Sequence, residues 1–295
     1  MKNRIFILAG LTALVLPGQA AMVYGLTTRN ELVRFDSSAP GSLQQASFIW
    51  GLAPNESLVG IDFRPANNML YGVGSFGRIY TIQPMTGMAT FVNSLTDSVT
   101  GAPLSLMGTE FGVDFNPVPD RLRVTSNQGQ NLRINVATGV TVVDGMLNQA
   151  SGRPHIVASA YTNNFPGATT TTLYNIDSVS DMLTRQVPPN NGTQVNVGML
   201  GMDVSALAGF DIMTVAGMDM AYAALQSAGM QGSRFARINL STGMATDLGM
   251  IGRDQTSDSL AIRDIAINPV PEPGTLLALG AGLATLVRRR RSPRR

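Results

Sequence analysis

Between residues 21 and 269 the chain consists of short hydrophobic runs separated by Gly, Pro, Asn and Asp. No segment of this region keeps hydrophobic positions at a helical period for more than two turns. Short runs bounded by turn-forming residues are typical of β-strands. The pattern therefore predicts an all-β fold over 21–269.

The runs fall into four types that follow one another in a fixed order. The first type has an acidic centre and reads LVGIDFRP (58–65), EFGVDFNP (110–117), LAGFDI (207–212) and IRDIAINP (262–269), with HIVASAYTN (155–163) lacking the acid. The second type is marked by Tyr24, Tyr71, Arg123, Tyr174 and Tyr222. Successive steps between these five residues are 47, 52, 51 and 48 residues, which indicates an internal repeat of about 50 residues.

A repeat of about 50 residues with four antiparallel strands is typical of a propeller blade. We therefore predict a single closed β-propeller, with five four-stranded blades. The chain starts on the second run type and ends on the first, so residues 262–269 must supply the innermost strand of the N-terminal blade. That pairing would close the ring and remove an open sheet edge. A pair of β-sandwiches is the alternative architecture.

A Thr-Gly pair follows the third run type at the same offset in three repeats, at Gly87, Gly139 and Gly243. Because glycine adopts positive φ without a steric penalty, the pair predicts a turn into the fourth strand.

Composition excludes several kinds of chemistry. The 295 residues include no cysteine and one histidine, His155, which removes disulfides, thiolate catalysis and any multi-histidine metal site. The formal charge of +2 is concentrated at the ends, because eight of the 21 basic residues lie in the first four or the last eight positions. Elsewhere 13 basic residues face 19 acidic ones, a net charge of −6, so we expect no nucleic-acid partner.

The N-terminus, residues 1–20, has the three parts of a secretory signal peptide. Lys2 and Arg4 form a basic start, an apolar stretch runs to Leu16, and small residues at Gly18 and Ala20 precede the expected cut. The sequence predicts export and processing by signal peptidase, with a buried N-terminal helix as the alternative.

Residues 270–295 contain Pro271, Glu272 and Pro273, then an apolar segment over 275–287 and an arginine-rich end. As a helix that segment would be about 20 Å long, short of the roughly 30 Å hydrocarbon core. These three parts resemble the PEP-CTERM sorting signal, which exosortase processes in exported bacterial proteins. The resemblance implies a Gram-negative cell, transient membrane association through a transmembrane segment at 275–287, and a link to biofilm or exopolysaccharide. An uncleaved tail anchor is the alternative.

The body of the chain resembles the DUF4394 family of exported bacterial proteins. The resemblance is clearest in GVDFNPVPDRLRVTSNQGQNLRIN (112–135) and TTLYNID (171–177), and weakest in the Met- and Gly-rich stretch 199–220. It supports the fold and the export, and it transfers no catalytic residue.

Four acidic residues, Asp62, Asp114, Asp211 and Asp264, stand at the centre of the first run type, where the run at 155–163 offers Ala160 or Tyr161. Inner strands line a propeller axis, so we expect these carboxylates to form a ring around it. They could bind a cation, and oxygen ligands without histidine or cysteine would suit Ca²⁺. The alternative, which we favour, is that each carboxylate accepts hydrogen bonds from the next blade.

Two further motifs suggest chemistry. Arg123, Asn131 and Arg133 could share one face of adjacent strands and bind a carboxylate or a sugar, although internal pairing with Asp120 and Asp114 is favoured. Residues 72–77 fit G-x-G-x-x-G, but a strand-like run follows, so a hairpin is predicted in place of a dinucleotide site. We expect His155 to be a hydrogen-bonded turn residue.

With no catalytic set identified, the sequence favours an exported, non-catalytic propeller that binds a ligand at the cell envelope, the outer surface or the matrix, and exopolysaccharide is the candidate partner. The alternative is a propeller lyase, lactonase or glycosidase that uses the axial aspartates and a divalent cation. Fold membership does not separate the two classes.

Overall fold

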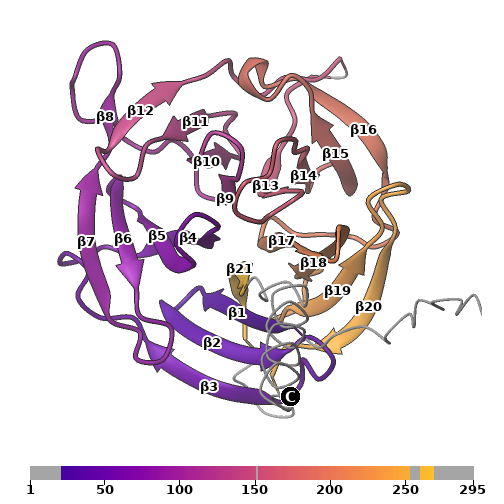
Figure 1. The fold of residues 1–295 in the computed structure, drawn as a ribbon. Helices are drawn as coiled ribbons and strands as arrows, with labels where there is room; N and C mark the ends of the chain where they lie inside the picture. Colours follow the sequence, from indigo (N-terminus) through magenta and orange to yellow (C-terminus); the bar gives the residue numbers. More distant parts are fainter. Residues whose placement is uncertain (1–20, 151, 253–259, 269–295) are drawn as a thin grey trace, which may run out of the picture.

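The computed structural model describes residues 21–150, 152–252 and 260–268. Five antiparallel sheets stand around a central axis, each with one strand near the centre and one at the rim (Figure 1). This arrangement is a five-bladed β-propeller, and it confirms the predicted fold class. The proposed signal peptide at 1–20 and the sorting signal with Pro271, Glu272 and Pro273 lie outside the described residues.

The blades are numbered here in chain order. Blade one contains β21 (Ile262–Ile267), β1 (Met22–Thr27), β2 (Glu31–Asp36) and β3 (Leu43–Phe48). Blade two contains β4 (Leu58–Arg64), β5 (Met69–Gly74), β6 (Arg78–Ile82) and β7 (Ala89–Ser94). Blade three contains β9 (Phe111–Asn116), β10 (Arg121–Ser126), β11 (Asn131–Ile134) and β12 (Val140–Val143).

The remaining two blades complete the ring. Blade four contains β13 (Ile156–Tyr161), β14 (Leu173–Asp177), β15 (Met182–Gln186) and β16 (Gln194–Met199). Blade five contains β17 (Ala208–Val215), β18 (Met218–Leu225), β19 (Arg234–Ile238) and β20 (Ala245–Met250). A short 3₁₀ helix, η1 (Pro189–Asn191), precedes β16. The two-residue strand β8 (Thr96–Asp97) pairs in parallel with β12 and gives blade three a fifth strand.

Burial falls from the axis to the rim. The inner strand β4 is buried from Leu58 to Phe63, and every residue of β13 is buried, because each inner strand packs between the inner strands of two neighbouring blades. The outer strand β7 is buried only at Ala89. This gradient explains the sequence pattern, since strands covered on both faces carry near-continuous apolar runs.

Strand β21 closes the ring. It pairs antiparallel with β1, with Val23 opposite Ile267 and Gly25 opposite Ile265. Residues from the two ends of the described chain thus form one sheet, as the order of the run types predicts.

The three Thr-Gly turns have the predicted backbone. Gly87, Gly139 and Gly243 have φ values of 71°, 76° and 81°, and each lies between the third and fourth strands of its blade. A Cβ atom at Gly87 would meet the backbone of Phe48 in the preceding blade, so glycine also allows the close contact between blades at the rim.

No helix within the described ranges is long and apolar enough to cross a membrane. The expected transmembrane segment at 275–287 lies outside the described residues.

Candidate functional site

The axial aspartates occupy two levels, which differs from the expectation of one shared position. Strand register places Asp62, Asp114 and Asp211 opposite the marker residue of the second strand in blades two, three and five. In blade four that position holds Ala160, opposite Tyr174. In blade one it holds Ala266, opposite Tyr24, because Asp264 lies two residues away and pairs with Leu26.

Three glycines bring the inner strands close together. Gly60, Gly112 and Gly209 each stand two residues before an axial aspartate, on the same face of the strand. A Cβ atom at Gly209 would lie 2.6 Å from the backbone of Asp264 in the adjacent blade. Glycine is therefore required where neighbouring inner strands meet.

Each axial carboxylate accepts a hydrogen bond from a backbone N–H of the next blade. The donor–acceptor distances are 2.7 Å from Phe115 N to Asp62 Oδ2, 3.1 Å from Tyr161 N to Asp114 Oδ1, 2.6 Å from Ile267 N to Asp211 Oδ2, and 2.9 Å from Ile61 N to Asp264 Oδ2. This is the geometry of the favoured interpretation, in which the aspartates connect the blades.

The junction between blades four and five has a different connection, because Ala160 has no carboxylate. Here Asn163 N donates to Asp219 Oδ1 at 3.0 Å, and Asn164 N donates to Thr214 Oγ1 at 3.0 Å. The connection has moved from the axis towards the end of β17.

The axial carboxylates are buried without a cationic partner. All four side chains are 1–2% exposed, and within the described ranges none of them forms an ion pair. Burial raises the pKa of Asp62 and Asp114 well above their usual range, and the neighbouring carboxylates add to the effect. Burial also raises the pKa of Asp211 to about 7.

The arginine cluster of blade three pairs internally. Arg123 is 1% exposed, and its guanidinium donates to Asp144 Oδ2 at 2.7 Å and to Asn131 Oδ1 at 2.8 Å. Arg133 donates to both carboxylate oxygens of Asp144, at 2.7 and 2.9 Å. The partner is therefore Asp144 and not the expected Asp120, which pairs with Arg64 of blade two. Arg123 and Asn131 are buried, so they present no face to an external ligand.

The two other motifs are structural. The glycines of residues 72–77 connect β5 to β6 as a hairpin, as predicted. The turn holds the buried Glu56, which accepts hydrogen bonds from Phe76 N at 3.1 Å and from the Tyr80 hydroxyl at 2.6 Å. His155 precedes β13, and its Nδ1 lies 2.8 Å from Ser178 Oγ.

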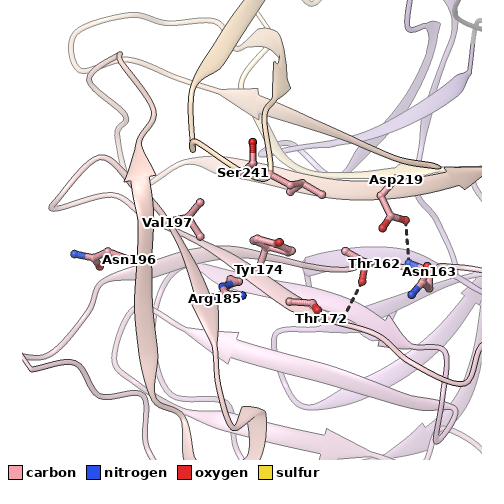
Figure 2. Close-up of a pocket in the computed structure, with 10 residues that line it drawn as sticks. Thr162, Asn163, Thr172, Tyr174, Arg185, Asn196, Val197, Asp219 and Ser241 are labelled. Atoms are coloured by element: carbon pink, nitrogen blue, oxygen red, sulfur yellow. Dashed lines mark hydrogen bonds between the residues drawn. The ribbon is translucent and has the colours of Figure 1, made fainter. Parts of the chain in front are cut away.

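A polar pocket of about 700 Å³ lies between blades four and five. Its lining residues are Thr162, Asn163, Thr172, Tyr174, Arg185, Asn196, Val197, Asp219, Leu240 and Ser241. In Figure 2 the Tyr174 ring lies between Ser241 on one side and Arg185 and Thr172 on the other, with Asp219 and Asn163 at one end. The pocket thus combines one aromatic ring with a cation, an anion, amides and hydroxyls.

A break in the repeat explains why the pocket is at this junction. At two other junctions the marker tyrosine packs edge-to-face against an aromatic residue of the next inner strand. The ring centroids are 5.4 Å apart for Tyr24 and Phe63, and 5.3 Å apart for Tyr71 and Phe115. Blade five has Ile212 at the position of Phe63, directly after the axial aspartate. Tyr24 and Tyr71 are buried, whereas Tyr174 is only half-buried and borders the cavity.

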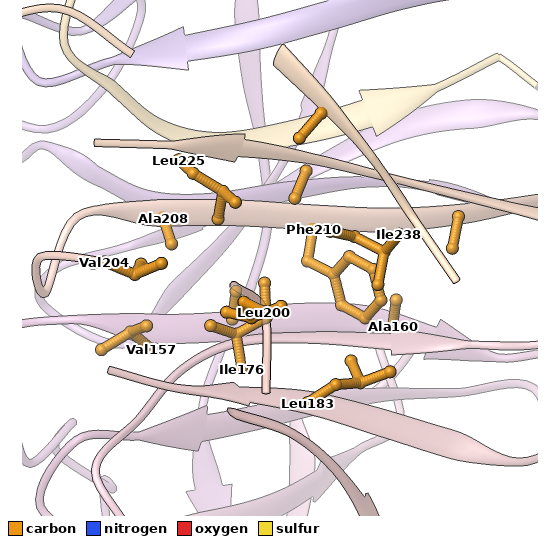
Figure 3. Close-up of a cluster of buried hydrophobic side chains, with 14 of the residues drawn as sticks. Val157, Ala160, Ile176, Leu183, Leu200, Val204, Ala208, Phe210, Leu225 and Ile238 are labelled. Carbon is orange, nitrogen blue, oxygen red and sulfur yellow. The ribbon is translucent and has the colours of Figure 1, made fainter. Parts of the chain in front are cut away.

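The floor of the pocket is apolar. Tyr174, Val197 and Leu240 pack against a core cluster that both blades supply, including Ile176, Phe210 and Ile238 (Figure 3). Burial raises the pKa of the Tyr174 hydroxyl, with a smaller contribution from Asp219 and an opposing one from Arg185. The hydroxyl is therefore protonated at neutral pH and available as a donor.

Sequence reasoning did not identify this pocket. Tyr174 was recognised only as a repeat marker, and Arg185 and Asp219 were not singled out. A signal was present, because blade four alone lacks the axial acid and blade five lacks the aromatic residue that follows it in blades two and three. Both departures affect the same junction.

Comparison with known families gives two matches. A family model described as "Domain of unknown function (DUF4394)" matches residues 31–266, four fifths of the chain. A second, described as a PEP-CTERM protein-sorting motif, matches residues 269–291. Export and sorting to the cell envelope follow from the second match.

Two solved structures are similar at low identity. A structural genomics protein of unknown function from Bacteroides thetaiotaomicron VPI-5482 is 11% identical, with a TM-score of 0.46 over 84% of this chain and 64% of that one. Hydrazine synthase from Kuenenia stuttgartiensis is 10% identical, with a TM-score of 0.38 over 69% of this chain and 53% of that one. The chain thus spans less than two thirds of either protein. No curated protein matches it.

Proposed function

The chain belongs to the DUF4394 family and carries a PEP-CTERM sorting motif, and from this premise we propose that it is an exported, non-catalytic propeller that binds a saccharide of the extracellular matrix. The pocket between blades four and five is the binding site. The observation that carries the proposal is the half-buried Tyr174 ring, set among polar groups in a cavity of about 700 Å³.

The chemistry of the pocket fits a sugar. A pyranose ring has one apolar face, which can pack on the tyrosine ring, and hydroxyls around its edge that both donate and accept hydrogen bonds. Asn196 and Ser241 offer both kinds of partner, and Asp219 accepts. The exposed Arg185 guanidinium can bind a carboxylate of an acidic sugar through paired hydrogen bonds. A volume of this size is within the range of small-molecule sites.

Binding is favoured over hydrolysis because of the acids that are available. Glycosidases generally use a pair of carboxylic acids on either side of the scissile bond. Asp219 is the one carboxylate among the described residues that line the pocket, and it already accepts hydrogen bonds from Asn163 N and from the Thr214 hydroxyl. The axial aspartates are 1–2% exposed and out of reach of a polysaccharide.

The test is calorimetric titration of the purified protein with oligosaccharides prepared from the extracellular polysaccharide of the producing cells. We expect Tyr174→Leu, which keeps the apolar contact with the core and loses the ring, to weaken binding by about tenfold, or 1.4 kcal/mol. We expect Arg185→Ala to weaken the binding of acidic sugars more than the binding of neutral sugars.

Two exposed residues elsewhere provide matched controls. Phe76→Leu removes an aromatic ring that is 55% exposed on blade two, and Arg29→Ala removes an arginine whose side chain is 61% exposed on blade one. Both variants should bind as the wild type does. If Tyr174→Leu and Phe76→Leu weaken saccharide binding equally, or if the protein binds no matrix saccharide, this pocket is not a saccharide-binding site.

A further inference from the structure

Three carboxylates from three blades converge on the axis. Asp62, Asp114 and Asp211 each offer one oxygen, and these oxygens all lie within 4.8 Å of one another. Each side chain is 1% exposed. Oxygens that share one Ca²⁺ ion at 2.3–2.6 Å are at most about 5 Å apart, so the three fit a single ion.

One atom of this cluster has no partner. The backbone bond to Phe115 occupies Oδ2 of Asp62, but Oδ1 is buried and accepts no hydrogen bond from the described residues. Burying an acceptor without a hydrogen-bond donor costs folding free energy, and the cost is larger when the acceptor belongs to a charged carboxylate. A cation that reached this oxygen would remove that cost.

Hydrogen bonds from the neighbouring blades fix the orientation of these carboxylates. Asp114 and Asp211 each accept a backbone N–H from a neighbouring inner strand, which holds the carboxylates in place before any ion arrives. Asp211 and Asp264 each accept a second backbone N–H on the other oxygen, from Ile212 and Ile265. Asp264 differs from the other three in its level, because it pairs with β1 two residues away from the position that they share.

We propose that Asp62, Asp114 and Asp211 bind one Ca²⁺ ion on the propeller axis, where it connects blades two, three and five. The ligands are oxygen atoms only, which suits a hard divalent cation. Water completes the coordination. Because the side chains are closed to solvent, the ion stabilises the fold and does not contact a substrate.

The experiment measures calcium binding to the purified full chain after treatment with chelator, by calorimetry and by thermal unfolding. A ligand that binds only the folded state at a hundredfold excess over its Kd raises the folded-to-unfolded ratio about a hundredfold. We expect one ion per chain and a higher melting temperature in calcium than in chelator.

The decisive variant is Asp62→Asn. Its amide removes one charge and offers donors to the other two carboxylates, so we expect it to melt in chelator at or above the wild-type temperature and to gain nothing from calcium. If Asp62 acts only through its hydrogen bond from Phe115 N, calcium should not change the melting temperature of the wild type or of Asp62→Asn.

Two controls separate the ion from folding defects. Asp264→Asn should lower the melting temperature in both buffers and keep the calcium-dependent shift. Asp120→Asn breaks an ion pair with Arg64 away from the axis, so it should also keep the full calcium-dependent shift, even if its melting temperature is lower in both buffers. The proposal fails if the wild type binds no calcium and melts equally in both buffers. It also fails if Asp62→Asn keeps the full shift.

Discussion

Arg123 is a residue whose type suggests binding but whose position makes it structural. It takes the marker position that tyrosine holds in the other blades, and its guanidinium reaches across to blade four, to the Tyr161 hydroxyl at 3.1 Å and to Asn190 Oδ1 at 2.9 Å. With Asp144 it forms an ion pair that is almost completely buried. Replacing one member of such a pair leaves the other without compensation.

We therefore expect Arg123→Met to lower the free energy of unfolding by about 3 kcal/mol, at the low end for a broken buried pair because Arg133 still reaches Asp144. Arg133→Met is the matched control. Its side chain is 31% exposed, so its loss should cost about 1 kcal/mol or less. Urea denaturation of the three proteins measures both values, and equal losses would contradict this account of Arg123.

For the axial aspartates, one nearby residue in the sequence indicates the level of the side chain along the propeller axis. Gly60, Gly112 and Gly209 precede the three converging aspartates by two residues, whereas Ile262 stands at that distance before Asp264. The G-x-D pattern thus separates the three from the fourth. Treating all four as equivalent ignored this difference, and only the strand register made it visible.

At the scale of elements, the order of the four run types was sufficient to predict which strands share a blade. The structure adds β8, a two-residue strand that the hydrophobic pattern could not show, because Thr96 and Asp97 are polar and join the sheet of the next repeat through β12. It also places clear strands, β17 and β18, in the region 199–220 and beyond, where the family pattern is weakest.

Strand β21 is the element on which closure depends. Deleting residues 262–269 removes three buried isoleucines, and each large core side chain is worth roughly 2–5 kcal/mol. Their sum is comparable with the whole net stability of about 5–15 kcal/mol. We therefore expect the shortened protein to lose cooperative unfolding or to melt far below the intact one in a thermal scan.

The control for that deletion is a protein that ends at residue 268, which keeps β21 and lacks only the sorting signal. It should melt at the same temperature as the full chain. If the protein without β21 also melts there, the pairing with β1 does not hold the ring together.

For the whole molecule, the ends and the body have separate roles. The body carries the propeller, and the sorting motif at 269–291 directs the exported chain to the cell envelope. Removal of the arginines at the C-terminus leaves a molecule with excess negative charge.

We expect the mature protein to lack Arg288 to Arg295, because exosortase processing acts on the sorting motif at 269–291, which contains Pro271. Intact-mass analysis of protein recovered from the envelope of the native cells measures this directly. A species that still contains the arginine-rich end would contradict cleavage and support a tail anchor.

The sequence by itself determined the strand order, the number of blades, the closure by the last strand and the C-terminal sorting motif, because each of these is written in local patterns and their spacing. Only the tertiary structure decided which aspartates share a level, that Asp144 pairs with both arginines, and that Tyr174 borders a pocket. These features depend on contacts between blades, such as that of Arg123 with Asn190, 67 residues away. A periodic pattern fixes which face of a strand a residue occupies, but the register between strands and the neighbour from the next blade decide what that residue meets.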